Sequence, residues 1–326
     1  MSVTRVAAIA GLVVVIGSFG CAGPHAVRSP SRGGQTTSPA TVHARAVACI
    51  GMTVVDVERS VRFFTQVLGF TEGVDEVLEG EKHARLEGVP GARTRRVRLD
   101  LGRECVEVSQ PLGGVRRLMP ADSRSNDRWF QHVAIVVRDI DAAYLALESA
   151  HVVHGSESPQ TLPAWNKSAA GIRAYYFKDP DGHTLELIWF PPGKGLARWH
   201  EAGTDSLFLG IDHTAVSASN TDASVRFYEE IGFHVAGTSE NWGPEQERLN
   251  SVPGAHLQIT TLRTAEGPGV ELLEYLAPRD GRPMPADDRG DDVSHWRTVL
   301  VSDVRLPKGS LALRDPDGHS MEIHGP

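Results

Sequence analysis

The chain has 326 residues, of which 40% are hydrophobic and 23% are charged, and its formal net charge is -8. Since one hydrophobic core rarely grows beyond about 250 to 300 residues, this length predicts two globular domains. The charges are acidic in balance and mixed in sign along the chain. They exclude a basic stripe for nucleic acid and a polybasic membrane contact.

The first 21 residues have the layout of a secretory signal. Arg5 precedes an apolar run over 6–16, and small residues lead from there to Cys21. The run is too short to span a bilayer as a mature helix. A cysteine directly after an apolar region resembles a bacterial lipoprotein signal, so we expect export to the cell envelope with a lipid anchor on Cys21. A plain cleaved signal and secretion are the alternative. Residues 22–44, rich in Ser, Pro, Gly and Thr, predict a flexible linker.

The remainder of the chain contains an internal repeat. Three strings recur at nearly constant distance: SVRFF at 60–64 as SVRFY at 224–228, VPGA at 89–92 and again at 252–255, and PAD at 120–122 and again at 285–287. Their offsets of 163 to 165 residues indicate that one half was duplicated. We predict a first domain over 45–192, a linker over 193–209 and a second domain over 210–326.

Each half divides again into modules with the order βαβββ. In module one, residues 46–54 alternate like a strand, residues 57–67 carry apolar side chains at helical spacing, and three strand-like runs follow to Val108. Module two repeats this order, with a strand from His132 and a helix over 140–149. Its last two strands are joined by DPDG at 179–182, a turn that suits Pro and Gly. The predicted fold class is therefore α+β.

Module three begins at Ile211 and repeats module one through Tyr275. Module four begins near His295 and is truncated, because DPDGH at 179–183 recurs at 315–319 only 136 residues later. That offset is 29 residues shorter than the 165 of the PAD string. No sequence is left for a helix or a second strand in module four.

These strings identify a family resemblance. VRFF at 61–64, LGF at 68–70, DPDGHTLEL at 179–187 and a His that opens a strand before SVRFY resemble the vicinal oxygen chelate superfamily. That group includes glyoxalase I, extradiol dioxygenases, methylmalonyl-CoA epimerase and the bleomycin- and fosfomycin-resistance proteins. The resemblance covers about residues 46–326. It implies four modules, the last truncated, that form two open barrel-like mixed sheets.

The resemblance also implies that each module offers one metal ligand from its first strand, usually His, and one from its last strand, usually Glu. In module two these positions hold His132 and Glu186. In module three they hold His213 and Glu271. Matched acids and imidazoles at equivalent inward positions have no packing reason, so we expect these four residues to be metal ligands.

The other two modules depart from this pattern. Their last strands carry Glu107 and Glu322, but Cys49 stands at the His position of module one. In module four that position is Arg297, or His295 one pleat earlier. Pairing modules one with two and three with four would give two mixed sites. Pairing two with three and one with four would give one complete site, and we favour this arrangement because the defects then collect in the other site.

Two imidazoles and two carboxylates suit Zn²⁺, Ni²⁺, Fe²⁺ or Mn²⁺. The resemblance implies a metal-dependent lyase or isomerase of glyoxalase type, acting on a small molecule with vicinal oxygens, in which Glu186 or Glu271 moves the proton. Alternatives are an extradiol-type dioxygenase, which uses two His and one Glu on Fe²⁺, and a non-catalytic drug-binding or resistance protein. The protein is expected to be a monomer or homodimer.

Four further expectations concern particular residues. In this superfamily the first and last strands of a module are neighbours, so an oxidising compartment would permit a disulfide between Cys49 and Cys105, or leave two buried thiols. Arg173 is a candidate for holding an anionic group in the pocket, or a surface residue. His183 and His319 are in turns and are expected to be exposed. Five aromatic residues could line an apolar pocket or fill the core: Trp129, Phe130, Trp165, Tyr175 and Trp189.

Overall fold

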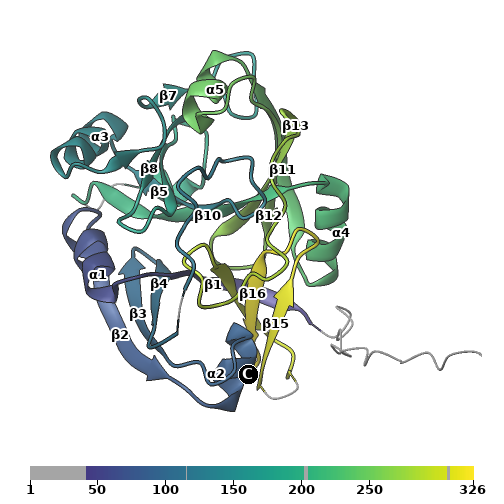
Figure 1. The fold of residues 1–326 in the computed structure, drawn as a ribbon. Helices are drawn as coiled ribbons and strands as arrows, with labels where there is room; N and C mark the ends of the chain where they lie inside the picture. The colour runs from purple at the N-terminus through teal and green to yellow at the C-terminus, as the bar shows by residue number, and fades with distance from the viewer. Residues whose placement is uncertain (1–41, 115, 202–204, 307–308) are drawn as a thin grey trace, which may run out of the picture. The chain divides into compact units, whose positions relative to one another are not determined.

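The computed structural model describes residues 42–114, 116–201, 205–306 and 309–326 (Figure 1). The predicted signal over 1–21 and nearly all of the predicted linker over 22–44 lie outside these described residues. Among the residues described, no helix is long and apolar enough to cross a membrane.

Modules one and three have the same sequence of elements. Module one contains β1 (Ala44–Thr53), α1 (Val57–Gln66), β2 (Thr71–Leu78), α2 (Glu81–Glu87), β3 (Thr94–Leu101) and β4 (Glu104–Pro111). Module three contains β10 (Phe208–Ala218), α4 (Thr221–Glu230), β11 (His234–Trp242), α5 (Pro244–Asn250), β12 (His256–Arg263) and β13 (Gly269–Ala277). The predicted order is confirmed, with one additional short helix, α2 or α5, in each of these modules.

Modules two and four are less regular. Module two contains β5 (Gln131–Val137), α3 (Ile140–Ser149), the fragments β6 (Val153–His154) and β7 (Gln160–Thr161), β8 (Arg173–Lys178) and β9 (Thr184–Trp189). A 3₁₀ helix, η2 (Ala197–His200), follows it. Module four contains β14 (Trp296–Ser302), β15 (Ser310–Arg314) and β16 (Ser320–His324). Its described residues contain no α-helix between β14 and β15, as the truncation predicted.

An equivalent side chain caps the first helix of modules one, two and three. The carboxylate oxygen of Asp56 accepts a hydrogen bond from the Arg59 backbone N–H, and Asp139 and Asn220 cap α3 and α4 in the same way. A polar cap satisfies N–H groups that the first helical turn leaves without partners. Each cap lies seven residues after the first-strand ligand position, so the turn into the helix is the same in these modules.

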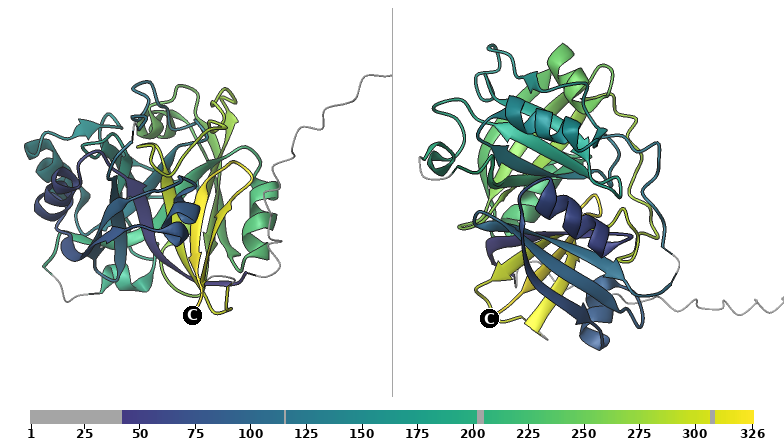
Figure 2. Two further views of the ribbon diagram at one scale, coloured as in Figure 1. Left: turned by 60° about the horizontal axis from the view of Figure 1, so that its bottom comes forward. Right: turned by 90° about the vertical axis from the view of Figure 1, so that its left-hand side faces the viewer.

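The strands form two mixed sheets that do not close into barrels. The seven-stranded sheet has the order β15-β16-β14-β1-β4-β3-β2, and the nine-stranded sheet has the path β11-β12-β13-β10-β5-β9-β8-β6, with β7 paired to β8. Figure 2 shows the C-terminal strands, in yellow, beside the N-terminal strand, in purple. The predicted pairing of module one with four and of module two with three is confirmed. Each sheet thus crosses the predicted boundary between the two halves.

The two largest hydrophobic cores mainly connect modules of the same half, module one with two and module three with four. Phe64 on α1 and Ile50 on β1 belong to the same buried cluster as Val133 and Ile135 on β5. A second cluster joins modules three and four in the same way. Truncating a fully buried Phe typically costs about 3 to 5 kcal/mol, so these cores bind the modules of each half together. Strands pair across the halves, the two largest cores lie mainly within them, and a third buried cluster joins modules two and three, so all four modules are fixed against one another.

Candidate metal centre

The four predicted ligands lie on one face of the nine-stranded sheet, on four consecutive strands. His132 on β5 and Glu271 on β13 are both in register with Ala215 on β10. His213 on β10 and Glu186 on β9 are both in register with Ala134 on β5. Because residues directly opposite one another share a sheet face, this register brings side chains from both halves of the chain to one place.

The ligand atoms of these residues converge. His132 Nε2 and His213 Nε2 are 3.4 Å apart, and Glu186 Oε2 lies 3.2 Å from the first and 3.4 Å from the second. Glu271 Oε2 lies 3.4 Å from His213 Nε2. Two ligands that are each about 2.1 Å from a shared ion are about 3.0 to 3.4 Å apart at octahedral to tetrahedral angles. The residues therefore fit a divalent ion with nitrogen and oxygen ligands.

His132, Glu186 and His213 form the compact part of this group. Their three ligand atoms all lie within 4.8 Å of one another, and all three residues are buried. Glu271 contacts the group through His213, and its other oxygen accepts a hydrogen bond from Thr261 Oγ1 at 2.7 Å. Two imidazoles and one carboxylate are the core of the site, and a second carboxylate is at its edge.

Asp212 supports the site from the position next to His213. Its Oδ2 lies 3.1 Å from His213 Nδ1, and its Oδ1 accepts a hydrogen bond from Trp199 Nε1 at 3.0 Å. Neighbouring residues in a regular strand point to opposite faces, but the β10–β5 register shifts between Ile211 and His213. This bulge allows Asp212 to reach the ring of its own neighbour and to orient it with Nε2 toward the other ligands.

The carboxylates and imidazoles of the site shift one another's pKa values. Burial alone would raise the pKa of Glu186, but hydrogen bonds from His132 and His213 outweigh it and hold the pKa at about 2. Burial alone would lower the pKa of His213, but Glu271, Asp212 and Glu186 raise it well above its usual value. A positive charge is thus favoured among these carboxylates, so a metal ion bound there would compete with a proton.

A cavity of about 450 Å³ opens over the four residues. Its polar lining includes Ser239, Asn241, Gln246, Thr261 and Arg263. Its apolar lining includes Leu162, Ile172, Ile188, Phe190, Leu196 and Ile259. Arg263 is the one Lys or Arg among the described lining residues, and its Nη2 lies 3.2 Å from both oxygens of Asp212. The cavity is large enough for a small organic molecule.

Comparisons with known proteins agree with this geometry. A family model described as the Glyoxalase/Bleomycin resistance protein/Dioxygenase superfamily matches residues 46–187. A protein from Actinomyces sp named 2-epi-5-epi-valiolone epimerase is 34% identical over 157 residues, which are 46% of this chain and 82% of that protein. The chain belongs to this superfamily.

Solved structures show the same fold over most of the chain. A variant of glyoxalase I from Zea mays superposes with a TM-score of 0.55 at 14% identity, covering 86% of this chain and 92% of that one. A putative dioxygenase from Bacillus subtilis has a TM-score of 0.52 at 13% identity, covering 87% and 86%. Members of this superfamily bind divalent metals and act on small molecules. In this chain His132, Glu186 and His213 form a possible metal site.

The seven-stranded sheet contains a second site at the equivalent positions, here called the counterpart site, in which the ligand residues are altered. Its register is identical: Arg297 and Glu107 lie opposite Gly51, and Cys49 and Glu322 lie opposite Val299. Arg297 is therefore the equivalent of His132, and Cys49 is the equivalent of His213. His295, the other candidate from the sequence, instead lies 3.1 Å from Asp288 through its Nδ1.

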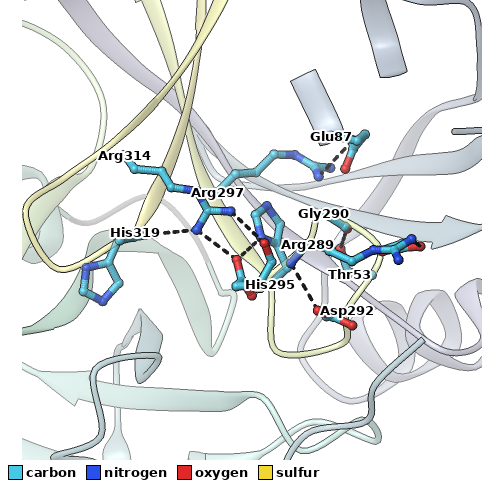
Figure 3. Close-up of polar contacts among 12 residues, drawn as sticks. Thr53, Glu87, Arg289, Gly290, Asp292, His295, Arg297, Arg314 and His319 are labelled. Atoms are coloured by element: carbon cyan, nitrogen blue, oxygen red, sulfur yellow. Dashed lines mark hydrogen bonds and ion pairs between the residues drawn. The ribbon is translucent and has the colours of Figure 1, made fainter. Parts of the chain in front are cut away.

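Guanidinium groups occupy the counterpart site. Arg297 Nη1 lies 3.5 Å from Glu87 Oε1 (Figure 3). Its Nε lies 3.6 Å from Glu322 Oε2. Arg96 Nη2 is 3.5 Å from the same Glu322 oxygen, and its Nη1 is 3.4 Å from Glu107. Burial alone would raise the pKa of Glu322, but His324 and the two arginines lower it to about 2. Two fixed positive charges thus lie where a divalent ion would lie in the complete site.

Two further differences from the complete site accompany this arrangement. A Cβ on Gly51 would lie 2.6 Å from Cγ and Nε of Arg297, whereas the equivalent position opposite His132 is Ala215. Cys49 and Cys105 form a disulfide with their Cα atoms 4.9 Å apart. The sequence allowed either a disulfide or two buried thiols at these positions, and the structure confirms the disulfide. The bridge removes the sulfur of Cys49 as a thiolate ligand.

One other expectation is wrong. His183 and His319 are buried, and the Asp179 and Asp315 carboxylates at the start of each turn lie 2.9 Å from their Nδ1 atoms. Of the two alternatives for Arg173, the surface position is confirmed: both its terminal nitrogens lie 2.7 Å from the exposed Asp141 carboxylate, and Arg173 does not line the cavity.

The aromatic residues do not line the metal cavity as a group. Tyr175 is in the core, and Trp189 packs against that core. Trp129 and Phe130 line a separate cavity of about 230 Å³. Trp165 is exposed and packs against Trp242, with ring centroids 3.8 Å apart and the rings tilted by 34°. Tyr176 and Phe190, which the sequence did not single out, are the aromatic residues in the lining of the metal cavity.

Proposed function

We propose that this protein is a divalent-metal-dependent isomerase of the glyoxalase or epimerase type, acting on a small substrate with vicinal oxygens. The observation that carries the proposal is the convergence of two imidazole nitrogens and two carboxylate oxygens beneath a cavity of about 450 Å³. The similarity to a protein named as an epimerase supports the same class of reaction. His132, Glu186, His213 and Glu271 would hold Zn²⁺, Ni²⁺, Fe²⁺ or Mn²⁺. The bound ion would supply a Lewis acid for a substrate carbonyl.

Glu271 is the better placed of the two candidate bases. Its side chain is 18% exposed, against 7% for Glu186, which lies against both imidazoles. Thr261 donates a hydrogen bond to Oε1 of Glu271 and fixes the carboxylate at the cavity wall. In the proposed reaction Glu271 takes the proton from the carbon beside the carbonyl, holds it on a carboxylate oxygen, and returns it to the same or the neighbouring carbon.

An extradiol-type dioxygenase is the second candidate, and one observation favours it. The compact part of the site is two His and one Glu, which is the ligand set of non-heme Fe²⁺ oxygenases. Glu271 would then lie outside the ligand set, because it contacts only His213 among the other three.

One experiment separates these reactions. The purified chain is loaded with Zn²⁺, Ni²⁺, Mn²⁺ or Fe²⁺ and incubated in D₂O with α-hydroxyketones, and deuterium incorporation beside the carbonyl is followed by NMR. The isomerase proposal predicts metal-dependent incorporation that Glu271→Gln reduces by at least about a hundredfold. Oxygen uptake with a catechol on Fe²⁺ alone, without exchange under any metal, would replace it with the dioxygenase. Absence of both activities with fully loaded protein would leave a binding function.

We also propose that the mature protein is exported and lipid-anchored on Cys21. The Cys49–Cys105 bridge supports an oxidising compartment. Mass spectrometry of protein from membranes should find a diacylglyceryl group on an N-terminal Cys21. A mature chain that begins elsewhere in the membrane or culture medium, or that retains Met1, contradicts the anchor.

A further inference from the structure

The charges that face the metal cavity are already in balance once a divalent ion is present. Three lining carboxylates, Glu186, Glu271 and Asp212, carry three negative charges. Arg263 and a divalent ion carry three positive charges. All three acids are at least four-fifths buried in their side chains, at 7%, 18% and 7% exposure. An anionic substrate would therefore add a buried charge that no described lining residue compensates.

Arg263 is not free to act as an anion clamp. Its Nη2 lies 3.2 Å from both Asp212 oxygens, and Asp212 in turn holds the ring of His213. Turning the guanidinium toward a substrate phosphate or carboxylate would leave the Asp212 carboxylate without this cation. The role of Arg263 is therefore to neutralise Asp212 behind the metal ligands.

The cavity walls offer neutral polar groups on one side and apolar groups on the other. On the edge strand β11, Ser239 lies opposite Ile259 and Gly237 lies opposite Thr261, so these residues share the face that carries Glu271. The Ser239 hydroxyl makes no hydrogen bond to another described residue. Ile172, Ile188 and Phe190 line the cavity as well, and they offer only apolar surface.

We propose that the substrate is an uncharged hydroxyketone. Its oxygens would lie toward the ion held by the four ligands and toward the β11 wall, and its apolar face would lie against Ile188 and Phe190. This inference rests on the proposed function and narrows it. Phosphate esters, carboxylates and anionic thiol adducts are disfavoured by the charge of the cavity, whatever their size. Shape and hydrogen bonding then select among the neutral molecules.

The test measures binding, so that it does not depend on turnover. The full chain is loaded with Zn²⁺, its zinc content is measured, and saturation-transfer NMR gives dissociation constants for dihydroxyacetone, 2-hydroxycyclohexanone and dihydroxyacetone phosphate. We expect the neutral probes to bind and the phosphate ester to bind at least about tenfold more weakly than dihydroxyacetone. Ester binding equal to or tighter than that of dihydroxyacetone overturns the inference, as does failure of both neutral probes to bind.

A charge placed on the cavity wall provides a second test. Ser239→Lys should shift the preference toward the phosphate ester by about tenfold, and Ser239→Gln, which has a long side chain without charge, should not. If the two variants leave the same preference, charge does not govern selection and the inference is wrong. A chain that retains no zinc refutes the proposed function itself, and this inference with it. Zinc retention together with a preference for the ester refutes the inference alone.

Discussion

Asp212 and His213 are adjacent in the chain, yet the Asp212 carboxylate accepts a hydrogen bond from the Nδ1–H of its neighbour at 3.1 Å. The bulge in β10 makes this contact possible. A carboxylate behind a metal-ligating imidazole fixes its tautomer and raises its basicity. His132 has no such support, because its buried Nδ1 has no hydrogen-bond partner among the described residues.

The first prediction concerns this contact. Asp212→Asn should weaken metal affinity by about ten- to a hundredfold while the chain stays folded, because the amide keeps the shape but not the charge of the carboxylate. Competition with a chelating dye measures the affinity. Asp288→Asn is the matched control, since Asp288 lies at the same 3.1 Å from His295, away from the metal ligands. An equal loss of affinity in both variants would show that Asp212 acts through general stability.

The second prediction concerns the Cys49–Cys105 bridge, which closes a loop with a sequence separation of 56. Removing it with Cys49→Ala and Cys105→Ala should lower the free energy of unfolding by about 2 to 4 kcal/mol, because the unfolded chain gains conformational freedom. Urea unfolding of metal-free protein measures this change. Metal affinity should stay within about twofold, and a larger loss would place the bridge in the metal site.

The third prediction concerns the counterpart site. Arg297→Met should destabilise the fold by about 3 to 5 kcal/mol, because it leaves Glu322 and Glu87 buried with less compensating charge. Adding Glu322→Leu to this variant should recover part of the loss, since it removes one of the uncompensated acids. The same urea titration measures both variants. A single variant as stable as the unmodified chain would mean that Arg96 alone balances the acids.

The fourth prediction concerns pH. Burial alone would lower the pKa of His183, but Asp179, 2.9 Å away, raises it above the usual value. A raised folded pKa means that the contribution to stability is complete below about pH 6.5, the ordinary value for His. It is lost as the pH rises through the folded pKa.

Urea unfolding between about pH 6 and 9, with a chelator to remove metal effects, measures this slope. His183→Gln should flatten it, because the variant removes the titrating ring beside Asp179. A slope that is unchanged in His183→Gln would assign the pH dependence to other groups, His319 with its Asp315 partner first among them.

The sequence predicted the features that follow from repetition. Offsets between equivalent strings aligned the modules, and the conserved distance from each cap residue to its ligand position located His132 and His213. Alignment through the PAD string offered Arg297 as the counterpart of His132, with His295 as the alternative. These inferences depend on regular strands, in which side-chain direction follows from position.

Features that break strand regularity could not be predicted in this way. Asp212 reaches His213 only through a bulge, and alternation alone would place it on the other face. The helices α2 and α5 have seven residues each and begin after a glycine without a capping side chain, so periodicity and capping give little signal. The burial of His183 involves residues far along the chain, since its Nε2 lies 2.7 Å from the Val293 carbonyl oxygen and its ring packs against Trp296, and a turn motif alone does not show this.

Counting bound metal in a matched pair of variants tests the central claim most directly. His132 and Arg297 occupy the same register position in the two sheets. After saturation with Zn²⁺ and dialysis, elemental analysis should find one ion per chain in the unmodified protein and in Arg297→Met, and essentially none in His132→Ala. His213→Ala should also lose the ion, while Cys49→Ala and Glu322→Gln should keep it. Retention of the ion in His132→Ala, or its loss in Arg297→Met with the fold intact, would contradict a single metal site built across the two halves of the chain.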